Sequence, residues 1–567
     1  MSSSGCNYFY RIHRKHPKRM GFLYILCILL LSLTITVLSV KVNGKNDNRR
    51  HIVIIIADDL GWNDVSSHGT DQVMTPNIDS LGYAGVTLGR YYSHCICTPS
   101  RSALLTGKYA YTTGMQGYPL TNGEDRGLPT TEKILPQYLK ELGYATHLVG
   151  KWHVGGSREK YLPTKRGFDT YFGHRGGFVD YYEYTSEENW SIGKVSGMDL
   201  YRNETAAWDE EGYITDLYTE EAISIINSHD ASKPLFLMMA HLAPHSGNDG
   251  AILQAPPEVV RSMRHVESPE RRIFAAMVKK LDDSVGDVVE ALSEKGILNK
   301  TIILFISDNG GMTSGDSVNY ANNYPLRGLK MTPFEGGIRV VGAIWASDEI
   351  TSHQYDGYVH VSDWLPTLLK AIGEEPPNNI DGHDLWANII MNQTSSRAEI
   401  VEIDDMAGYQ SYIHGDFKLI TGHVDQKYSN HQGKDLLGII GKPPSYTDAI
   451  VNSKVYSVFK KAGRTIHFED MVIRNRFKDL CPKHDDEDDE LCHPGNGTVC
   501  LFNIKNDPCE RKNIAEANPY IVKTMIERLS IEKKRVIPRA NSIVREPRAN
   551  PAFFNYTWHS FVDQVSS

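Results

Sequence analysis

The sequence lacks an excess of basic residues and shows no internal repeat. Its 567 residues contain 60 Lys and Arg against 69 Asp and Glu, a formal net charge of −9 at pH 7. This balance argues against nucleic acid as a partner, because nucleic-acid binding needs a basic surface. The apolar content of 41% excludes a disordered or fibrous chain, and the length allows two or more domains.

Acidic residues are absent from residues 1–44, which contain six basic ones and an uncharged run from Gly21 to Val40. Basic residues before an apolar run are typical of export. We therefore predict a signal peptide in residues 1–44, cut near Val42-Asn43-Gly44. The run is also long enough to span a bilayer, so an uncleaved signal anchor is the alternative. Without this segment 54 basic and 69 acidic residues remain, a net charge of −15.

Cysteine is scarce, with eight residues in the whole chain. Cys6 and Cys27 belong to the export segment, whereas Cys95 and Cys97 lie close together. Four more form a late cluster: Cys481, Cys492, Cys500 and Cys509. In an exported chain we expect these four to form disulfide bonds, with the pairing left open.

Six Asn-x-Ser/Thr acceptor sites support a destination in the secretory pathway, either lysosomal or extracellular, because such sites are glycosylated only there and on exposed loops. The acceptor residues are Asn189, Asn203, Asn299, Asn392, Asn496 and Asn555.

Four apolar runs predict β-strands that are buried on both faces, because their hydrophobicity is continuous and not alternating. The runs are Ile52–Ala57, Thr146–Val149, Leu235–Ala240 and Ile302–Ser307. Each ends in polar residues: Asp58-Asp59, Gly150-Lys151-Trp152-His153, His241 with His245, and Asp308-Asn309-Gly310-Gly311. A helical pattern from Phe274 to Leu292, closed by Gly296, completes an α/β layout. Ligands of open α/β sheets bind outside the carboxyl ends of the strands, so we expect these polar clusters to meet in space.

After about Arg397 the pattern changes to short extended segments at Glu399–Ile403, Ser411–Ile413 and Phe417–Thr421. We predict a catalytic domain over residues 50–396 and a smaller C-terminal domain with an antiparallel sheet, plus a tail, over residues 397–567. The acidic run Asp485–Glu490 fits a solvated loop better than a calcium site, which needs ligands that converge from a folded loop.

The most specific local signal is Cys97-Thr98-Pro99-Ser100-Arg101, followed by Thr106-Gly107. Taken alone, this stretch also suits a buried cysteine at a helix start, since Pro99 fits the first turn. It resembles the signature Cys-x-Pro-x-Arg of the sulfatase family, in which a dedicated oxidase converts the cysteine to formylglycine.

Further motifs follow in the order of that family between about Ile52 and Leu369. They are Asp58-Asp59-Leu60-Gly61-Trp62, Gly150-Lys151-Trp152-His153, Arg166 to Tyr171, Ser307 to Gly311, Leu326 to Lys330, and Glu335-Gly336-Gly337. Together they resemble arylsulfatase B-like members, related to N-acetylgalactosamine 4-sulfatase. The resemblance implies an alkaline-phosphatase-like fold, in which helices flank a large mixed sheet.

The oxygen-bearing residues after two of the strands form a ligand set suited to a hard cation. They are Asp58, Asp59, Asp308 and Asn309, joined by an oxygen on the modified Cys97. The resemblance implies one Ca²⁺. An Asp-Asp pair after a strand could instead cap a helix, but a second acid–amide pair after another strand favours the metal.

Cleavage of a sulfate ester needs a cation pocket, an activated nucleophile and a proton donor. Hydrated formylglycine would carry two hydroxyls on one carbon, one to attack sulfur and one to expel sulfate after deprotonation. The resemblance places Arg101 and Lys151 on the formylglycine and sulfate oxygens and His153 beside the second hydroxyl. It places His245 and Lys330 near the leaving oxygen, although His241 remains a rival to His245. We expect His94 to be an ordinary, partly buried histidine.

The sequence thus predicts a sulfuric ester hydrolase acting on a sulfated carbohydrate or an aryl sulfate. The resemblance favours the N-acetylgalactosamine 4-sulfate of glycosaminoglycans as substrate, and small sulfated metabolites such as plant glucosinolates are the alternative. Two other classes compete. The first is a phosphate ester hydrolase of related fold, but such enzymes use Ser or Thr with zinc, and the Cys97 motif argues against them. The second is a secreted sulfatase-like glycoprotein that lacks turnover.

Overall fold

The computed structural model describes residues 49–315, 317–347, 350–430, 438–464, 466, 474, 476–477, 480–481, 491–539 and 544–563. The predicted leader or anchor at 1–44 and the acidic run at 485–490 lie outside these residues. In the part of the chain that is described, no helix is both long and apolar enough to cross a membrane.

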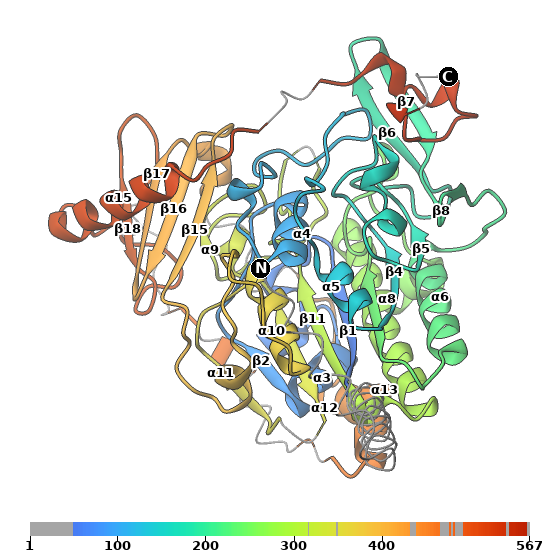
Figure 1. Ribbon diagram of the computed structural model, residues 1–567. Coiled ribbons are helices and arrows are strands. Elements are labelled where there is room, and N and C mark those ends of the chain that lie inside the picture. The colour runs from blue at the N-terminus through green and yellow to red at the C-terminus, as the bar shows by residue number, and fades with distance from the viewer. Residues whose placement is uncertain are drawn as a thin grey trace, which may run out of the picture. The chain divides into compact units, whose positions relative to one another are not determined.

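A ten-stranded mixed sheet forms the centre, in the order β13-β2-β12-β11-β1-β10-β4-β5-β8-β9 (Figure 1). Its five middle strands, from β11 to β5, are parallel, whereas β12 and β8 pair antiparallel on either side. The parallel strands are β1 (His51–Ala57), β4 (Ala145–Gly150), β5 (Thr170–Gly173), β10 (Leu235–Ala240) and β11 (Thr301–Ser307). The flanking strands are β2 (Val86–Leu88), β8 (Tyr201–Arg202), β9 (Thr205–Ala206), β12 (Gly342–Ala346) and β13 (His353–Tyr355). All four predicted strands are therefore confirmed, to within a residue at either end.

Alternate residues of β1 enter two separate hydrophobic cores, one on each face of the sheet. Val53, Ile55 and Ala57 pack with α3 (Pro76–Ala84), α6 (Ile214–Ser228), α8 (Pro269–Glu294) and α13 (Lys454–Lys461). Ile52, Ile54 and Ile56 pack with α4 (Cys97–Thr106), α5 (Leu135–Glu141), α10 (Trp364–Ala371) and α11 (Trp386–Ile390). The continuous hydrophobicity of β1 thus reflects burial on both faces. α8 ends near the predicted position, with Gly296 two residues beyond it in the left-handed region at φ 77°.

A second sheet of four antiparallel strands follows, in the order β15-β16-β17-β18. Its strands are β15 (Glu399–Asp404), β16 (Tyr409–His414), β17 (Phe417–Gly422) and β18 (Cys500–Asn503), and α15 (Pro519–Lys533) lies along it (Figure 1). One face packs on α15 through Met525 and Leu529, and the other contacts Cys95 and Ile96. The predicted antiparallel sheet is confirmed.

Segments after residue 397 also return to the central sheet. α12 (Tyr446–Val451) and α13 pack against α3, and residues 557–562 bond to the loops around Gly156 and Met198. The late cysteines pair as Cys481–Cys509 and Cys492–Cys500, which resolves the pairing that the sequence leaves open. The domain division at residue 397 stays a prediction.

Candidate active site

The strand register brings the predicted polar clusters to one edge of the central sheet. Ala57 at the end of β1 pairs with Ser307, Ile56 pairs with Ala240, and Ala240 pairs with Gly150. The residues that follow these positions therefore start side by side. Gly150 turns the chain there with a φ of 102°, and a Cβ on it would lie 1.9 Å from the carbonyl oxygen of Ala240. Only glycine fits this turn, which delivers Lys151 to the site.

Two buried ion pairs hold the site together. One joins the ends of β4 and β1, and the other joins the end of β11 to α4, the helix of the signature motif. Lys151 Nζ lies 2.6 Å from Asp58 Oδ2. Arg101, on α4, donates from Nε and Nη2 to Asp308 Oδ2 at 3.1 and 2.8 Å. All four side chains are almost fully buried. Such pairs fix the positions of their partners, because separating either one would leave an uncompensated buried charge.

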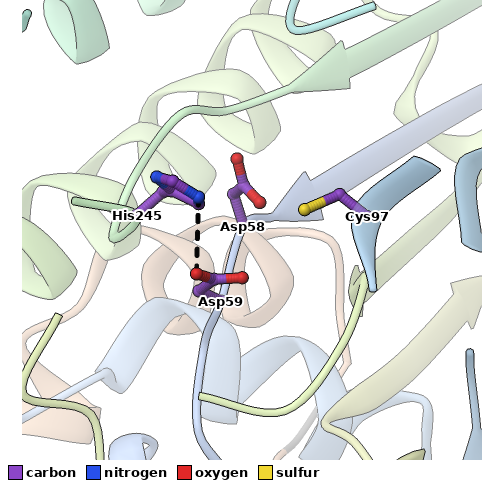
Figure 2. Close-up of side chains that lie close together, drawn as sticks. All are labelled: Asp58, Asp59, Cys97 and His245. Atoms are coloured by element: carbon purple, nitrogen blue, oxygen red, sulfur yellow. Dashed lines mark ion pairs between the residues drawn. The ribbon is translucent and has the colours of Figure 1, made fainter. Parts of the chain in front are cut away.

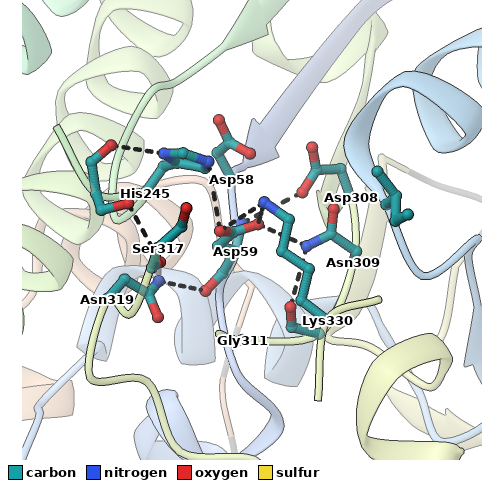
Figure 3. Close-up of polar contacts among 12 residues, drawn as sticks. Asp58, Asp59, His245, Asp308, Asn309, Gly311, Ser317, Asn319 and Lys330 are labelled. Atoms are coloured by element: carbon teal, nitrogen blue, oxygen red, sulfur yellow. Dashed lines mark hydrogen bonds and ion pairs between the residues drawn. The ribbon is translucent and has the colours of Figure 1, made fainter. Parts of the chain in front are cut away.

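Asp59 is the centre of a second group of polar contacts (Figure 3). Its carboxylate accepts bonds from Lys330 Nζ at 2.8 Å and Asn309 Nδ2 at 2.6 Å, and His245 Nε2 lies 3.5 Å away. Its φ of 62° turns the chain sharply away from β1. Burial by itself would raise the pKa of Asp59, but Lys330 and then His245 outweigh that effect and lower it to about 2. Asp59 is therefore ionised at any physiological pH.

Cys97 is the first residue of α4, and its sulfur faces the aspartates (Figure 2). One ligand atom from each of Asp58, Asp59, Cys97 and His245 lies within 4.8 Å of the others. Burial raises the pKa of the Cys97 thiol to about 11, although Lys151 and Lys330 act in the opposite direction. The unmodified thiol is therefore protonated and a poor nucleophile.

Two buried oxygen atoms in this cluster have no hydrogen-bond donor among the described residues: Asp58 Oδ1 and Asn309 Oδ1. Arg101 Nη2 lies 3.8 Å from Asp58 Oδ1, which is too far for a hydrogen bond. Buried acceptors without donors are rare in folded proteins. Two of them beside ionised carboxylates fit a hard cation, so these residues suit the predicted metal.

His153 follows Lys151 with a φ of 54°, and its ring is held in one tautomer. Its Nε2 lies 2.9 Å from the carbonyl oxygen of Leu120, to which it must donate. Burial and, after it, the positive charge of Lys151 lower the pKa of His153 well below 6.5, so the ring is neutral. Its Nδ1 is consequently a buried acceptor, and no donor to it is present in the described structure.

The two candidate histidines after β10 lie in different environments. His245 points its Nε2 at Asp59, donates from Nδ1 to the carbonyl oxygen of Ser246 at 2.6 Å, and stacks on Phe178. His241 instead directs Nε2 to Ser284 on α8, at 3.1 Å. Burial is the main cause that lowers the pKa of each to about 3. The geometry thus favours His245 over its rival.

Three contributors to the site lack a distinctive sequence signal. Asn319 donates from Nδ2 to the backbone oxygens of Asp59 and Pro244, and Thr98 joins the loop of Leu120 to His153. His94 is fully buried, not partly, and its Nδ1 contacts Glu402 of β15. The contact between His94 and Glu402 is visible only in the folded structure, because more than 300 residues separate the two in the sequence.

Comparisons with known proteins agree with this geometry. The family model described as Sulfatase matches residues 50–374. Arylsulfatase J of Mus musculus is 36% identical over 514 residues, which cover 90% of this chain and 79% of that protein. N-acetylgalactosamine-6-sulfatase of Mus musculus is 31% identical over 369 residues, which cover 61% of this chain and 67% of that protein.

Two solved structures share the fold. Ps i-CgsB in complex with k-i-k-neocarrahexaose gives a TM-score of 0.68 at 24% identity, covering 90% of this chain and all of that one. BT4656 in complex with its substrate D-glucosamine-2-N,6-O-disulfate gives a TM-score of 0.57 at 17% sequence identity, and the match covers 87% of this chain and all of that one. At these identities the matches show the fold alone, and they confirm the predicted alkaline-phosphatase-like architecture.

Proposed function

This chain belongs to the sulfatase family, whose members are sulfuric ester hydrolases, and from that premise we propose that it cleaves sulfated carbohydrates with formylglycine at position 97 and one Ca²⁺. The observation that carries the proposal is the position of Cys97 at the start of α4. There it faces three carboxylates that are interlocked with Arg101, Lys151 and Lys330.

The side chains around Cys97 supply the groups that this reaction needs. Formylglycine would provide, as its hydrate, a nucleophilic hydroxyl and a second hydroxyl that can release sulfate. The neutral Nδ1 of His153 can accept a proton from a hydroxyl at position 97. Lys151 and Arg101 hold positive charge where the sulfate oxygens gain negative charge. A dedicated oxidase would act on Cys97 before folding, because the folded protein buries the thiol.

We propose calcium as the cation, because the motifs imply it and the donor set suits a hard ion. Asp58, Asp59, Asp308 and Asn309 offer oxygen alone, which hard cations prefer. When bound, the ion would supply a fixed positive charge that stabilises anionic oxygens. Arg101 and Lys151 already neutralise part of the carboxylate charge, so the ion would complete the pocket.

Chelation tests the metal. We expect a strong chelator to lower kcat/KM for nitrophenyl sulfate by about a thousandfold, since a catalytic metal contributes several kcal/mol. Calcium should restore activity, and Asn309→Ala should raise the calcium concentration needed for restoration. Asn77→Ala is the control, because Asn77 is also buried but bonds to Asp282 of α8 and not to the cluster. Restoration by zinc and not by calcium would contradict the proposal.

The substrate is proposed from the relatives and from the motifs. The name of one relative, N-acetylgalactosamine-6-sulfatase, specifies a sulfated amino sugar as its substrate. The motifs favour the 4-sulfate of that sugar in glycosaminoglycans. Purified protein should therefore hydrolyse 4- or 6-sulfated N-acetylgalactosamine faster than sulfated glucosinolates. A preference for the glucosinolates would assign the chain to small metabolites instead.

We also place the protein in the secretory pathway, lysosomal or extracellular. All six acceptor asparagines are exposed on the described surface, as glycosylation requires. We expect a glycosidase that removes N-linked glycans to lower the apparent mass of protein from a secretory cell. A Thr205→Ala change should remove one glycan, at Asn203, while Thr205→Ser should keep it. A wild-type band that keeps its apparent mass after glycosidase treatment would contradict this assignment.

A further inference from the structure

A pocket lies beside His153, on the side of the ring that faces Leu120, and we call it the flanking pocket. Its lining includes Arg126, His153, Gly156, Arg175, Trp558 and His559. Its cavity volume is about 20 Å³, which is enough for an ordered water or the oxygens of one small anion. His153 is thus a wall shared by the flanking pocket and the proposed reaction site.

Arg175 is a buried cation of the flanking pocket that lacks a paired carboxylate. Its side chain stacks on Tyr201 at 3.5 Å, and its one hydrogen bond through the guanidinium is a long contact of 3.5 Å to the carbonyl oxygen of Glu204. Its Nε is buried without an acceptor, and in the described structure no carboxylate lies within 4 Å. Arg126 in the same pocket differs, because Glu124 lies 2.7 Å from its Nε. A buried charge without a partner is costly, so Arg175 calls for an anion.

Asp199 contacts the backbone of Arg175 but forms no ion pair with its guanidinium in the described structure. Its two oxygens accept from the backbone N–H groups of Arg175 and Gly176, at 3.0 and 2.8 Å. Burial raises the pKa of Asp199 to about 7, against the effect of those bonds and of the positive charge of Arg175. Because both oxygens of Asp199 bond to backbone N–H groups, the guanidinium stays available on the pocket side.

The chain's C-terminal segment supplies the opposite wall of the flanking pocket. Ser560 Oγ donates to Gly156 at 2.9 Å, and Trp558 Nε1 donates to Ser186 at 3.0 Å. These bonds hold His559, whose ring stacks on Phe554 and whose Nδ1 is buried without a partner in the described residues. Two polar side chains from distant parts of the chain thus converge on one small space with bonding capacity left over.

We propose that Arg175 and His559 form a subsite for a second anionic group of the substrate. The inference rests on the proposed function, and it narrows the substrate to a sulfated sugar that carries another negative charge near the cleaved ester. A guanidinium recognises carboxylate and sulfate alike, so the second group is the carboxylate of a linked uronate or a second sulfate. Arg175 sets specificity and takes no part in bond cleavage.

Binding to the Cys97→Ala protein tests the subsite without turnover. Three ligands are compared by calorimetry: a monosulfated N-acetylhexosamine, the same sugar linked to a uronate, and a disulfated monosaccharide. We expect one of the two dianions to bind more tightly than the monoanion. Adding Arg175→Gln should weaken that dianion about 10- to 100-fold and change the monoanion less than twofold. The dianion that responds identifies the second group.

Kinetics of the active protein, which keeps Cys97, provide the second measurement. Arg175→Gln and His559→Ala should raise KM for the dianionic substrate and leave kcat/KM for nitrophenyl sulfate within twofold, while Arg175→Lys should retain part of the preference. Arg202→Gln is the matched control: Arg202 also stacks on an aromatic ring, at 4.3 Å from Phe172, but Glu210 and Glu221 already neutralise it.

Three outcomes would overturn the subsite. They are dianions that bind no more tightly than the monoanion, equal losses on all ligands in Arg175→Gln, and a loss in Arg202→Gln as large as that in Arg175→Gln. Hydrolysis of nitrophenyl sulfate by the wild type separates this failure from failure of the proposed function. A protein that cleaves that ester without dianion preference is a sulfatase without the subsite.

Discussion

Cys97→Ala is expected to abolish turnover of sulfated sugars and of nitrophenyl sulfate alike, by about a millionfold in kcat, which is the scale of loss when a nucleophile is removed. Both substrates need attack on sulfur from position 97, so the quality of the leaving group cannot rescue either. Cys97→Ser retains one hydroxyl and lacks the second, and it should stop after at most one turnover. Steady-state rates and a single-turnover measurement distinguish the two variants.

Cys95→Ala is the matched control for this prediction. Cys95 is also free and buried, lies two residues away, and contacts Tyr409 of the small sheet, not the aspartates. It should keep most of the activity. Mass spectrometry of the peptide that contains residue 97 should find an aldehyde in active protein. An intact thiol in fully active protein from a competent secretory cell would contradict the mechanism.

The sequence was sufficient to predict the strands that build the site. Their hydrophobicity is continuous because both faces of the central sheet are covered, and this pattern ends at Ala57 and Ser307, where the polar residues begin. Parallel pairing then places the strand ends together, so the approach of Asp58 to Lys151 follows from local pattern and sheet topology.

Contacts between distant segments could not be predicted in the same way. The contact of His94 with Glu402 and the wall that His559 contributes to the flanking pocket depend on how the C-terminal segments pack on the central sheet. No periodicity in the sequence encodes such packing. The choice between His241 and His245 is similar: both follow β10, and only the direction of each ring distinguishes them.

The small sheet also has a bearing on the nucleophile. Glu402 contacts His94, and Ser100 of α4 donates to the backbone oxygen of His94 at 3.0 Å. The loop before Cys97 is therefore held from β15 as well as from the central sheet. Residues after 397 contribute to the site through this contact, although they supply none of the predicted catalytic side chains.

His245→Ala is expected to impair sulfated sugars far more than nitrophenyl sulfate. A sugar hydroxyl is a weak acid, so its departure needs a proton donor at the bridging oxygen, whereas nitrophenolate leaves nearly unaided. Loss of a general acid costs roughly 100- to 10,000-fold, which should be seen in kcat/KM for the sugar. Because burial lowers the pKa of His245 to about 3, the ring is neutral before substrate binds. The negative charge of a sulfate ester beside it would favour its protonated form.

His241→Ala is the matched control, because its ring is also buried but bonds to Ser284 on α8. It should lower the stability of the fold while leaving the ratio of the two activities unchanged. Lys330 is the second candidate proton donor. Burial alone would lower its pKa, but the nearby Asp59 raises the pKa of Lys330 above the usual range. Lys330 therefore remains protonated and gives up its proton poorly. Lys330→Ala should therefore reduce both activities together by disturbing Asp59. Equal losses on the two substrates in His245→Ala would assign that histidine to sulfate binding, and a loss confined to the sugar in Lys330→Ala would make the lysine the proton donor.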